Sequence, residues 1–170
     1  MNSSVVCIKA TILPPPDVPD RISCYNKVDM KKGRTFTSER IRILIADDQA
    51  NVRKGLQVVL QLEEDLEVVG TAANGLEALE LAERLRPDII LMDLSMPHLD
   101  GCEAMRRIRD KKLPTLFIAL TTHSDPMSQG AAEQAGAVAL IEKGAPDTKL
   151  IQIIRSVWRT RPSIGQSQRF

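Results

Sequence analysis

The sequence is poor in aromatic residues, which make up 3% of its 170 positions. A hydrophobic core must therefore be built from aliphatic side chains. It holds three cysteines, Cys7, Cys24 and Cys102, which are too few and too scattered for a disulfide framework or a metal knuckle. This usage of cysteine favours a reducing compartment, and we expect a cytoplasmic protein.

Long apolar runs are also missing. No stretch approaches the roughly 18 residues that a membrane-spanning helix needs, so we expect no membrane association. The N-terminus lacks the long apolar core of a signal peptide and runs into a proline cluster, Pro14-Pro15-Pro16.

A large excess of one charge sign is absent as well, since the formal net charge is +1. Its distribution is uneven. Lys/Arg and Asp/Glu number seven and four in residues 1–40, thirteen and eighteen in residues 41–158, and three and none in residues 159–170. The central part is acidic, whereas phosphate contacts need Lys and Arg. We therefore expect no direct nucleic-acid binding by this chain.

The chain is expected to contain one folded domain with two flanking segments. Residues 1–40 show no sustained hydrophobic period and are predicted to form a mostly disordered arm. Met30 lies close enough to the domain to be an alternative start of translation. Residues 41–160 form the predicted domain, and residues 161–170 have the composition of a flexible tail.

Within residues 41–160, apolar runs alternate with segments of helical period. Strands are predicted at 41–46, 66–72, 89–93, 115–120 and 137–142, and helices near 52–60, 75–85, 102–108, 127–135 and 147–160. Five strand–helix units indicate a parallel sheet with helices on both faces. Because crossover connections are right-handed, the predicted fold is an α/β, doubly wound, three-layer sandwich.

Chemically reactive side chains stand where four of these strands end. Asp47 and Asp48 follow the first strand, Asp93 ends the third, Thr121 follows the fourth and Lys143 the fifth. The carboxyl ends of parallel strands share one edge of the sheet, where ligands bind. Grouped carboxylates repel one another, and Mg²⁺ resolves this conflict. A carboxylate beside Mg²⁺ is a suitable nucleophile toward phosphorus, and a lysine would offset the charge of the transferred group.

Each of these residues also has an ordinary explanation. Asp47 and Asp48 are good helix N-caps, Asp93 suits a turn, Thr121 suits a strand and Lys143 suits a solvated strand end. These explanations do not account for the coincidence of all five positions with strand ends, which favours a site.

Four motifs carry a resemblance to a known family: Ile43–Asp48, Leu91–Pro97, Leu120–Thr122 and Glu142–Ala145. In this order they resemble the response-regulator receiver domain of two-component signalling, over about residues 41–160. The Asp-Leu-Ser-Met-Pro and Lys-Gly-Ala forms are most similar to the NarL/FixJ-like class. The resemblance implies a flavodoxin-like sandwich with five parallel strands in the order 2-1-3-4-5.

The resemblance also implies roles for the site residues. Asp93 would accept a phosphoryl group from a sensor histidine kinase. The remaining roles would be Mg²⁺ binding by Asp48, Asp93 and the backbone carbonyl of Ser95, action through water by Asp47, a switch hydroxyl at Thr121 and pairing with the phosphate by Lys143. Such a domain is not an enzyme beyond its own Mg²⁺-dependent phosphorylation and dephosphorylation. A homodimer through the fourth helix, fifth strand and last helix is also compatible with the resemblance.

Two positions depart from the family pattern. Leu140 stands where receivers usually carry an aromatic switch residue, and Gly144 stands where a cis-proline is common. The helix-turn-helix domain usual in the NarL/FixJ-like class does not follow residue 160, which leaves a stand-alone receiver and a truncated transcriptional regulator both open.

Three other functions would each require a different set of residues. An inactive receiver-like interaction module would be free to lose one of the five strand-end residues. A metal-dependent phosphatase would need a second Asp where Ser95 stands. A flavodoxin-like cofactor binder would need a phosphate loop where Asp47 and Asp48 would repel phosphate.

Overall fold

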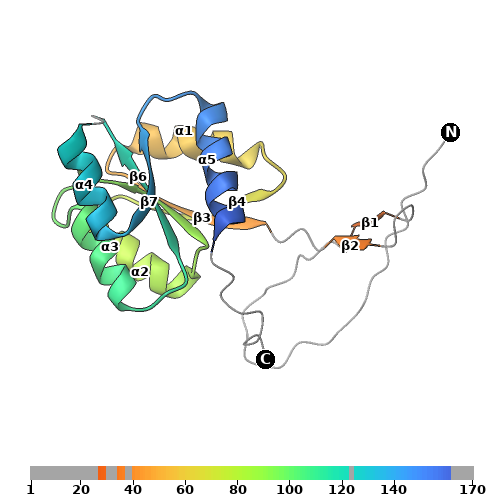
Figure 1. Cartoon of the computed structure of the whole chain (residues 1–170), viewed down its shortest axis with the longest axis horizontal. Coiled ribbons are helices and arrows are strands. Elements are labelled where there is room, and N and C mark those ends of the chain that lie inside the picture. The colour runs from red at the N-terminus through yellow and green to blue at the C-terminus, as the bar shows by residue number, and fades with distance from the viewer. Residues whose placement is uncertain (1–26, 30–33, 37–39, 123–124, 162–170) are drawn as a thin grey trace. The chain divides into compact units, whose positions relative to one another are not determined.

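The computed structural model describes residues 27–29, 34–36, 40–122 and 125–161 (Figure 1). The chain divides into two units, Met1–Arg40 and Ile41–Phe170, and each is described by itself. In the first unit, strands β1 (Lys27–Asp29) and β2 (Arg34–Phe36) pair in antiparallel fashion. The rest of the predicted arm, apart from Arg40, lies outside the described residues, and so does the predicted tail after Arg161.

The second unit alternates strands and helices along the chain. Its elements are β3 (Ile41–Ala46), α1 (Ala50–Gln61), β4 (Leu66–Ala72), α2 (Gly75–Leu85), β5 (Ile89–Asp93), α3 (Gly101–Asp110), β6 (Leu116–Thr121), α4 (Pro126–Ala135), β7 (Ala137–Glu142) and α5 (Asp147–Thr160). No helix in the described part combines the length and the hydropathy that a membrane span requires.

The five strands of this unit form one parallel sheet in the order β4-β3-β5-β6-β7. Numbered within the unit, this is the order 2-1-3-4-5, which confirms the predicted topology. Helices α1 and α5 cover one face of the sheet, and α2, α3 and α4 cover the other (Figure 1). Central strand β5 is consequently buried at all five positions.

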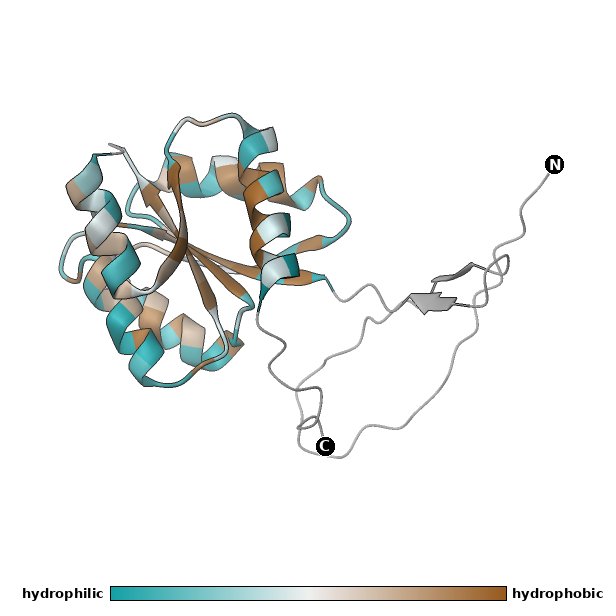
Figure 2. Cartoon of the chain, viewed as in Figure 1, coloured by the Kyte–Doolittle hydropathy of each residue, from teal (hydrophilic) through white to brown (hydrophobic). Residues whose placement is uncertain are grey.

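The core consists of two aliphatic clusters separated by the sheet. On β3, Leu44 and Ala46 point toward the α2–α3 side, whereas Ile43 and Ile45 point toward the α1–α5 side. This alternation follows from the two-residue period of a strand. Figure 2 shows the apolar strands between helices whose outer surfaces are hydrophilic. The expectation of a core with few aromatic residues is confirmed, because Phe117 is the one aromatic residue among the described buried hydrophobic residues.

Strand β6 begins one residue later than the sequence predicts. The Thr115 hydroxyl donates to the Pro87 carbonyl oxygen at 2.8 Å. Thr115 thus belongs to the connection that precedes the strand. Regular pairing starts at Leu116 and extends to Thr121, which lies opposite Glu142 of β7. Thr121 is therefore the last residue of the strand rather than the first residue after it.

An ion-pair network joins α5 to the loop between α1 and β4. The Arg155 guanidinium donates from Nε to Asp65 Oδ2 at 2.8 Å and from Nη2 to Asp65 Oδ1 at 2.7 Å. Nη2 also donates to Glu63 Oε2 at 2.6 Å. The hydrogen bond from Arg155 holds the pKa of Asp65 below its ordinary value. A bidentate contact between an arginine and a carboxylate fixes the orientation of α5 relative to this loop as well as its position.

Replacing Arg155 by Met is expected to lower the free energy of unfolding by about 1 kcal/mol at pH 7, a modest loss because solvent screens these partly exposed carboxylates. The pKa of Asp65 is lowered in the folded state, so this stabilisation is present above the unfolded pKa and is lost as pH falls through the folded one. Urea unfolding at pH 7 and at about pH 3 would measure the difference.

Lys149→Met is the matched control, because it removes a cation from the same helix at an exposed position. A loss for Arg155→Met that is equally large at both pH values would contradict the assignment to Asp65.

Candidate functional site

The predicted strand-end residues meet at one edge of the sheet. Asp47 follows β3, Asp93 ends β5, Thr121 ends β6 and Lys143 follows β7. Asp47, Asp93 and Thr121 are 0%, 1% and 6% exposed, and they are the three buried polar or charged residues of the described part of the chain. Burial of polar groups is costly, so their concentration at one edge marks it as the chemically specialised part of this domain.

The Lys143 side chain joins two of the buried carboxylates. Its Nζ lies 2.7 Å from Asp47 Oδ2 and 2.7 Å from Asp93 Oδ2. Burial lowers the pKa of Lys143, but the two carboxylates beside it outweigh this effect and raise the pKa above its ordinary value. The lysine is therefore held as a cation. Its backbone N–H also donates to the Thr121 carbonyl oxygen at 2.6 Å, which ties the ends of β6 and β7 together.

Loop amides hold the other oxygen of each carboxylate. Asp47 Oδ1 accepts a hydrogen bond from the Gln49 N–H at 2.8 Å. Asp93 Oδ1 accepts one from the Ser95 N–H at 3.0 Å. Aspartate often accepts from the amide two residues further on, and here this local turn orients both side chains. Ser95 itself lies exposed in the loop after β5.

Three carboxylates at this edge could hold a metal ion. Asp47, Asp48 and Asp93 each offer an oxygen atom, and these atoms lie within 4.8 Å of one another. Asp47 Oδ2 is buried and receives no well-aligned hydrogen bond, so the Lys143 ion pair is its polar contact within the described residues. Hard oxygen donors around a buried carboxylate fit a small divalent cation such as Mg²⁺.

The loop after Asp93 folds back on itself, so that the first residue of α3, Gly101, lies against the backbone of Asp93. The Gly101 N–H donates to the Leu94 carbonyl oxygen at 3.2 Å, and Asp100 caps the helix by accepting from the Glu103 N–H at 2.8 Å. A Cβ atom on Gly101 would collide with the carbonyl oxygen of Asp93. Gly101 is not among the site residues predicted from the sequence, but its missing side chain is a condition for this close approach.

Sequence reasoning also missed Arg53, on the first turn of α1. Its Nη1 donates to the carbonyl oxygens of Asp47, at 2.6 Å, and of Asp48, at 3.0 Å. Its position five residues after Asp48 was the available signal, because that spacing returns the side chain over the loop where the helix begins.

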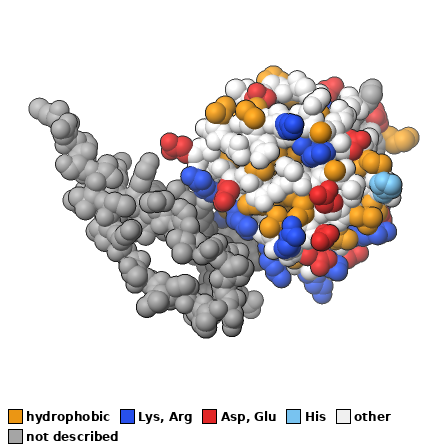
Figure 3. All heavy atoms as spheres, turned by 180° about the vertical axis from the view of Figure 1, so that it is seen from behind, with side chains coloured by type: hydrophobic (Ala, Val, Ile, Leu, Met, Phe, Trp, Pro, Cys, Tyr) orange, Lys and Arg blue, Asp and Glu red, His pale blue; other side chains and the backbone are white. Residues whose placement is uncertain are grey.

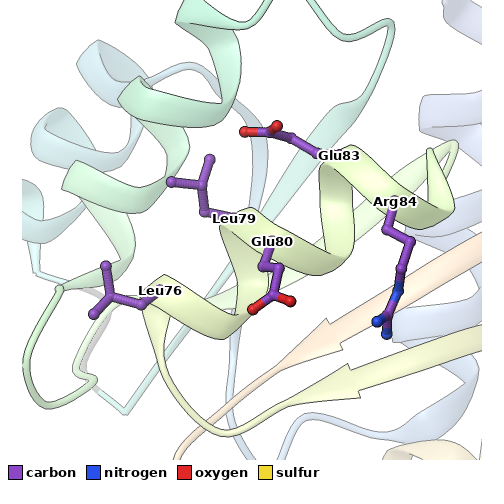
Figure 4. Close-up of a pocket in the computed structure, with 5 residues that line it drawn as sticks. All are labelled: Leu76, Leu79, Glu80, Glu83 and Arg84. Atoms are coloured by element: carbon purple, nitrogen blue, oxygen red, sulfur yellow. The ribbon is translucent and has the colours of Figure 1, made fainter.

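Hollows on the surface lie elsewhere. One is lined by side chains of α2 alone, shown in Figure 4: Leu76, Leu79, Glu80, Glu83 and Arg84. Another lies over α4, β7 and the first turn of α5. Neither is lined by the three carboxylates or by Lys143, so both hollows lie apart from the candidate site.

Comparison with known proteins agrees with this geometry. The response regulator receiver domain family matches residues 43–155, and the chain belongs to this family. It is therefore a signalling domain of the two-component class.

Particular relatives place it near the NarL-like regulators. The chain is 44% identical over 112 residues to the transcriptional regulatory protein YhcZ of Bacillus subtilis, covering 66% of this chain and 52% of that protein. It is 39% identical over 120 residues to the oxygen regulatory protein NreC of Staphylococcus carnosus, covering 70% of this chain and 55% of that protein. The chain thus spans about half the length of these relatives.

A solved structure shows the same fold. The signal receiver domain of the response regulator NarL from Mycobacterium tuberculosis aligns with a TM-score of 0.69 and 31% identity, covering 72% of this chain and 99% of that one. These relatives confirm the resemblance to the receiver domains of NarL-like response regulators.

Replacing Gly101 by Ala is expected to lower the free energy of unfolding by about 2–3 kcal/mol, because the added methyl group must displace backbone at Asp93. Gly55→Ala is the matched control, since a Cβ there meets nothing within 4 Å. In the interior of α1, alanine should raise stability by about 0.5–1 kcal/mol. Urea denaturation would measure both changes, and equal stabilities for the two variants would contradict the close approach.

Proposed function

We propose that this chain accepts a phosphoryl group on Asp93 from a sensor histidine kinase, with Mg²⁺ as cofactor. The observation that carries the proposal is the position of Lys143, whose cation lies between Asp93 and Asp47 at 2.7 Å from each. A cation fixed beside a potential nucleophile supports transfer of a strongly negative group, because phosphoryl transfer depends chiefly on positioning and charge stabilisation.

In the proposed step, a carboxylate oxygen of Asp93 attacks phosphorus while the bond from phosphorus to the donor histidine nitrogen breaks. The bonding electron pair leaves with the imidazole, and the product is an acyl phosphate on Asp93. Lys143 pairs with the phosphoryl oxygens that arrive. Mg²⁺, bound by Asp48, Asp93 and the Ser95 carbonyl with Asp47 acting through water, would supply further positive charge to those oxygens.

Thr121 is the proposed switch residue. Its buried position at the end of β6, beside Asp93 on neighbouring β5, puts a hydroxyl within the same sheet edge. Its carbonyl oxygen is bonded to the backbone of Lys143, so movement at Thr121 also acts on the start of the β7–α5 loop. Because Leu140 of β7 carries no ring, the readout is proposed to proceed through Thr121 and α4 rather than through an aromatic flip.

The surface formed by α4, β7 and α5 is the proposed contact with an output partner or a second copy of the chain. It contains a hollow lined by Val138 and Leu140 and flanked by Glu133 and Lys149. Val138 is 53% exposed, which is high for an aliphatic strand residue. The cytoplasmic location expected from cysteine usage remains a prediction.

A second candidate function follows from the length of the relatives. YhcZ is named a transcriptional regulatory protein and NreC an oxygen regulatory protein, and the chain spans about half of each. The proposal that this chain is the receiver part of a transcriptional regulator fits these relatives equally well. An inactive receiver-like module is less well supported, because the set Asp47, Asp48, Asp93, Thr121 and Lys143 is intact.

Acetyl phosphate with Mg²⁺ is expected to phosphorylate the wild-type protein and not Asp93→Asn, because the amide lacks the nucleophilic oxygen. Beryllofluoride should likewise bind only the wild type. Intact-mass spectrometry would detect the phosphoryl group. Asp110→Asn is the control, as it removes an exposed carboxylate at the end of α3. Equal phosphorylation of wild type and Asp93→Asn would rule out Asp93 as the acceptor.

The chain alone is expected not to bind DNA in a sequence-dependent way. Residues 41–158 carry thirteen Lys/Arg against eighteen Asp/Glu, and on the face seen in Figure 3 the two signs are interspersed. Phosphate contacts require a basic surface. A mobility-shift assay at about 150 mM salt would check this. Sequence-dependent binding that persists at higher salt would overturn it.

A further inference from the structure

We propose that Arg53 is a positioning residue that aims the Asp48 carboxylate at the divalent-cation site. The inference rests on the proposed function, since it assumes that the acidic edge binds Mg²⁺. It assigns a role to a side chain that is neither a ligand nor a participant in phosphoryl transfer.

The two contacts of Arg53 enclose a single residue. Its Nη1 donates to the Asp47 carbonyl oxygen at 2.6 Å and to the Asp48 carbonyl oxygen at 3.0 Å. The first oxygen belongs to the peptide unit before the Asp48 Cα atom, and the second belongs to the unit after it. The orientation of these two planar units determines the direction of the Cα–Cβ bond between them. One guanidinium nitrogen thus sets the direction of the Asp48 Cα–Cβ bond, from which the carboxylate extends.

Asp48 needs this support more than its neighbours do. Asp47 and Asp93 are each held by a loop amide and by Lys143. The Asp48 side chain is exposed, and its carboxylate has no hydrogen bond or ion pair within the described part of the chain. Its oxygen nevertheless lies within 4.8 Å of the other two ligand oxygens. The backbone that carries it is therefore the part of the structure that keeps it there.

Helix α1 gives Arg53 a firm base. The Arg53 N–H donates to the Gln49 carbonyl oxygen at 3.1 Å, so backbone and side chain both hold the same loop. Gln49 is the N-cap, and its side chain makes no capping hydrogen bond. Further along, Leu60 anchors the helix in the core at 0% exposure. The loop is thus attached through Arg53 to a helix packed on the sheet.

A positioning role and a purely electrostatic role predict effects of opposite sign. Arg53 places a positive charge beside the backbone of Asp47 and Asp48, and this charge alone opposes binding of a cation at the acidic edge. If charge were its whole effect, neutralising Arg53 would strengthen Mg²⁺ binding. If Arg53 aims Asp48, neutralising it releases the two peptide units and weakens Mg²⁺ binding. The direction of the change therefore separates the two roles.

The test is calorimetric titration of MgCl₂ into the unphosphorylated full chain, which reads metal binding without any phosphoryl transfer. Arg53→Met is expected to bind Mg²⁺ about tenfold more weakly than wild type, as is usual when a residue supporting a metal ligand is lost. Arg53→Gln, which is too short to reach both oxygens, should show the same loss if the Met variant melts too early. Lys54→Met, an exposed neighbour on α1, should bind as wild type or slightly more tightly.

A double-mutant cycle shows whether Arg53 acts through Asp48. In the Asp48→Asn background, Arg53→Met should change the affinity by less than about twofold, because the ligand it supports is already lost. The same tenfold loss in both backgrounds would overturn the inference, as would unchanged or tighter binding by Arg53→Met alone. Wild type that fails to bind Mg²⁺ would overturn the proposed function and this inference together. Wild type that binds while Arg53→Met binds equally well would overturn this inference alone.

Discussion

The Lys143 ammonium group, 2.7 Å from carboxylate oxygens of both Asp47 and Asp93, is the interaction on which the edge of the sheet depends. Two carboxylates buried this deeply are unstable as anions without a nearby cation. One lysine against two aspartates still leaves an excess of negative charge, and exposed Asp48 adds to it. Lys143 thus stabilises the two buried carboxylates in the folded domain. The remaining negative charge at this edge would attract a metal ion. Loop amides orient the Asp47 and Asp93 carboxylates, and Arg53 donates hydrogen bonds to the backbone after β3. Gly101 leaves room for the carbonyl oxygen of Asp93.

The fold could be predicted because its signals are local. Apolar runs such as Ile89–Met92 are continuous where strands have both faces covered, and breaks such as Pro87 end the helices between them. The start of β6 could not be placed in this way. Thr115 has the side chain of a strand residue, but its hydroxyl is bonded to the carbonyl oxygen of Pro87, which is distant in the sequence. A contact of this kind leaves no trace in the local pattern.

The same distinction separates the site residues that were anticipated from those that were missed. Asp47, Asp93 and Lys143 could be brought together in advance, because a parallel sheet collects the carboxyl ends of its strands at one edge. Arg53 and Gly101 act on backbone atoms, one by donating to carbonyl oxygens and the other by leaving room for one. An arginine on a helix and a glycine after a loop have many uses. Only the three-dimensional arrangement distinguishes among them.

The raised pKa of Lys143 determines how its ion pairs respond to a change in pH. A free lysine loses its proton near pH 10.4, and a raised value moves that loss still further from neutrality. The lysine therefore stays charged through any acidity that a living cell tolerates. A histidine in its place would let ambient protons alter the balance between Asp47 and Asp93. With lysine at this position, the ion pairs to Asp47 and Asp93 keep their cation across the neutral pH range.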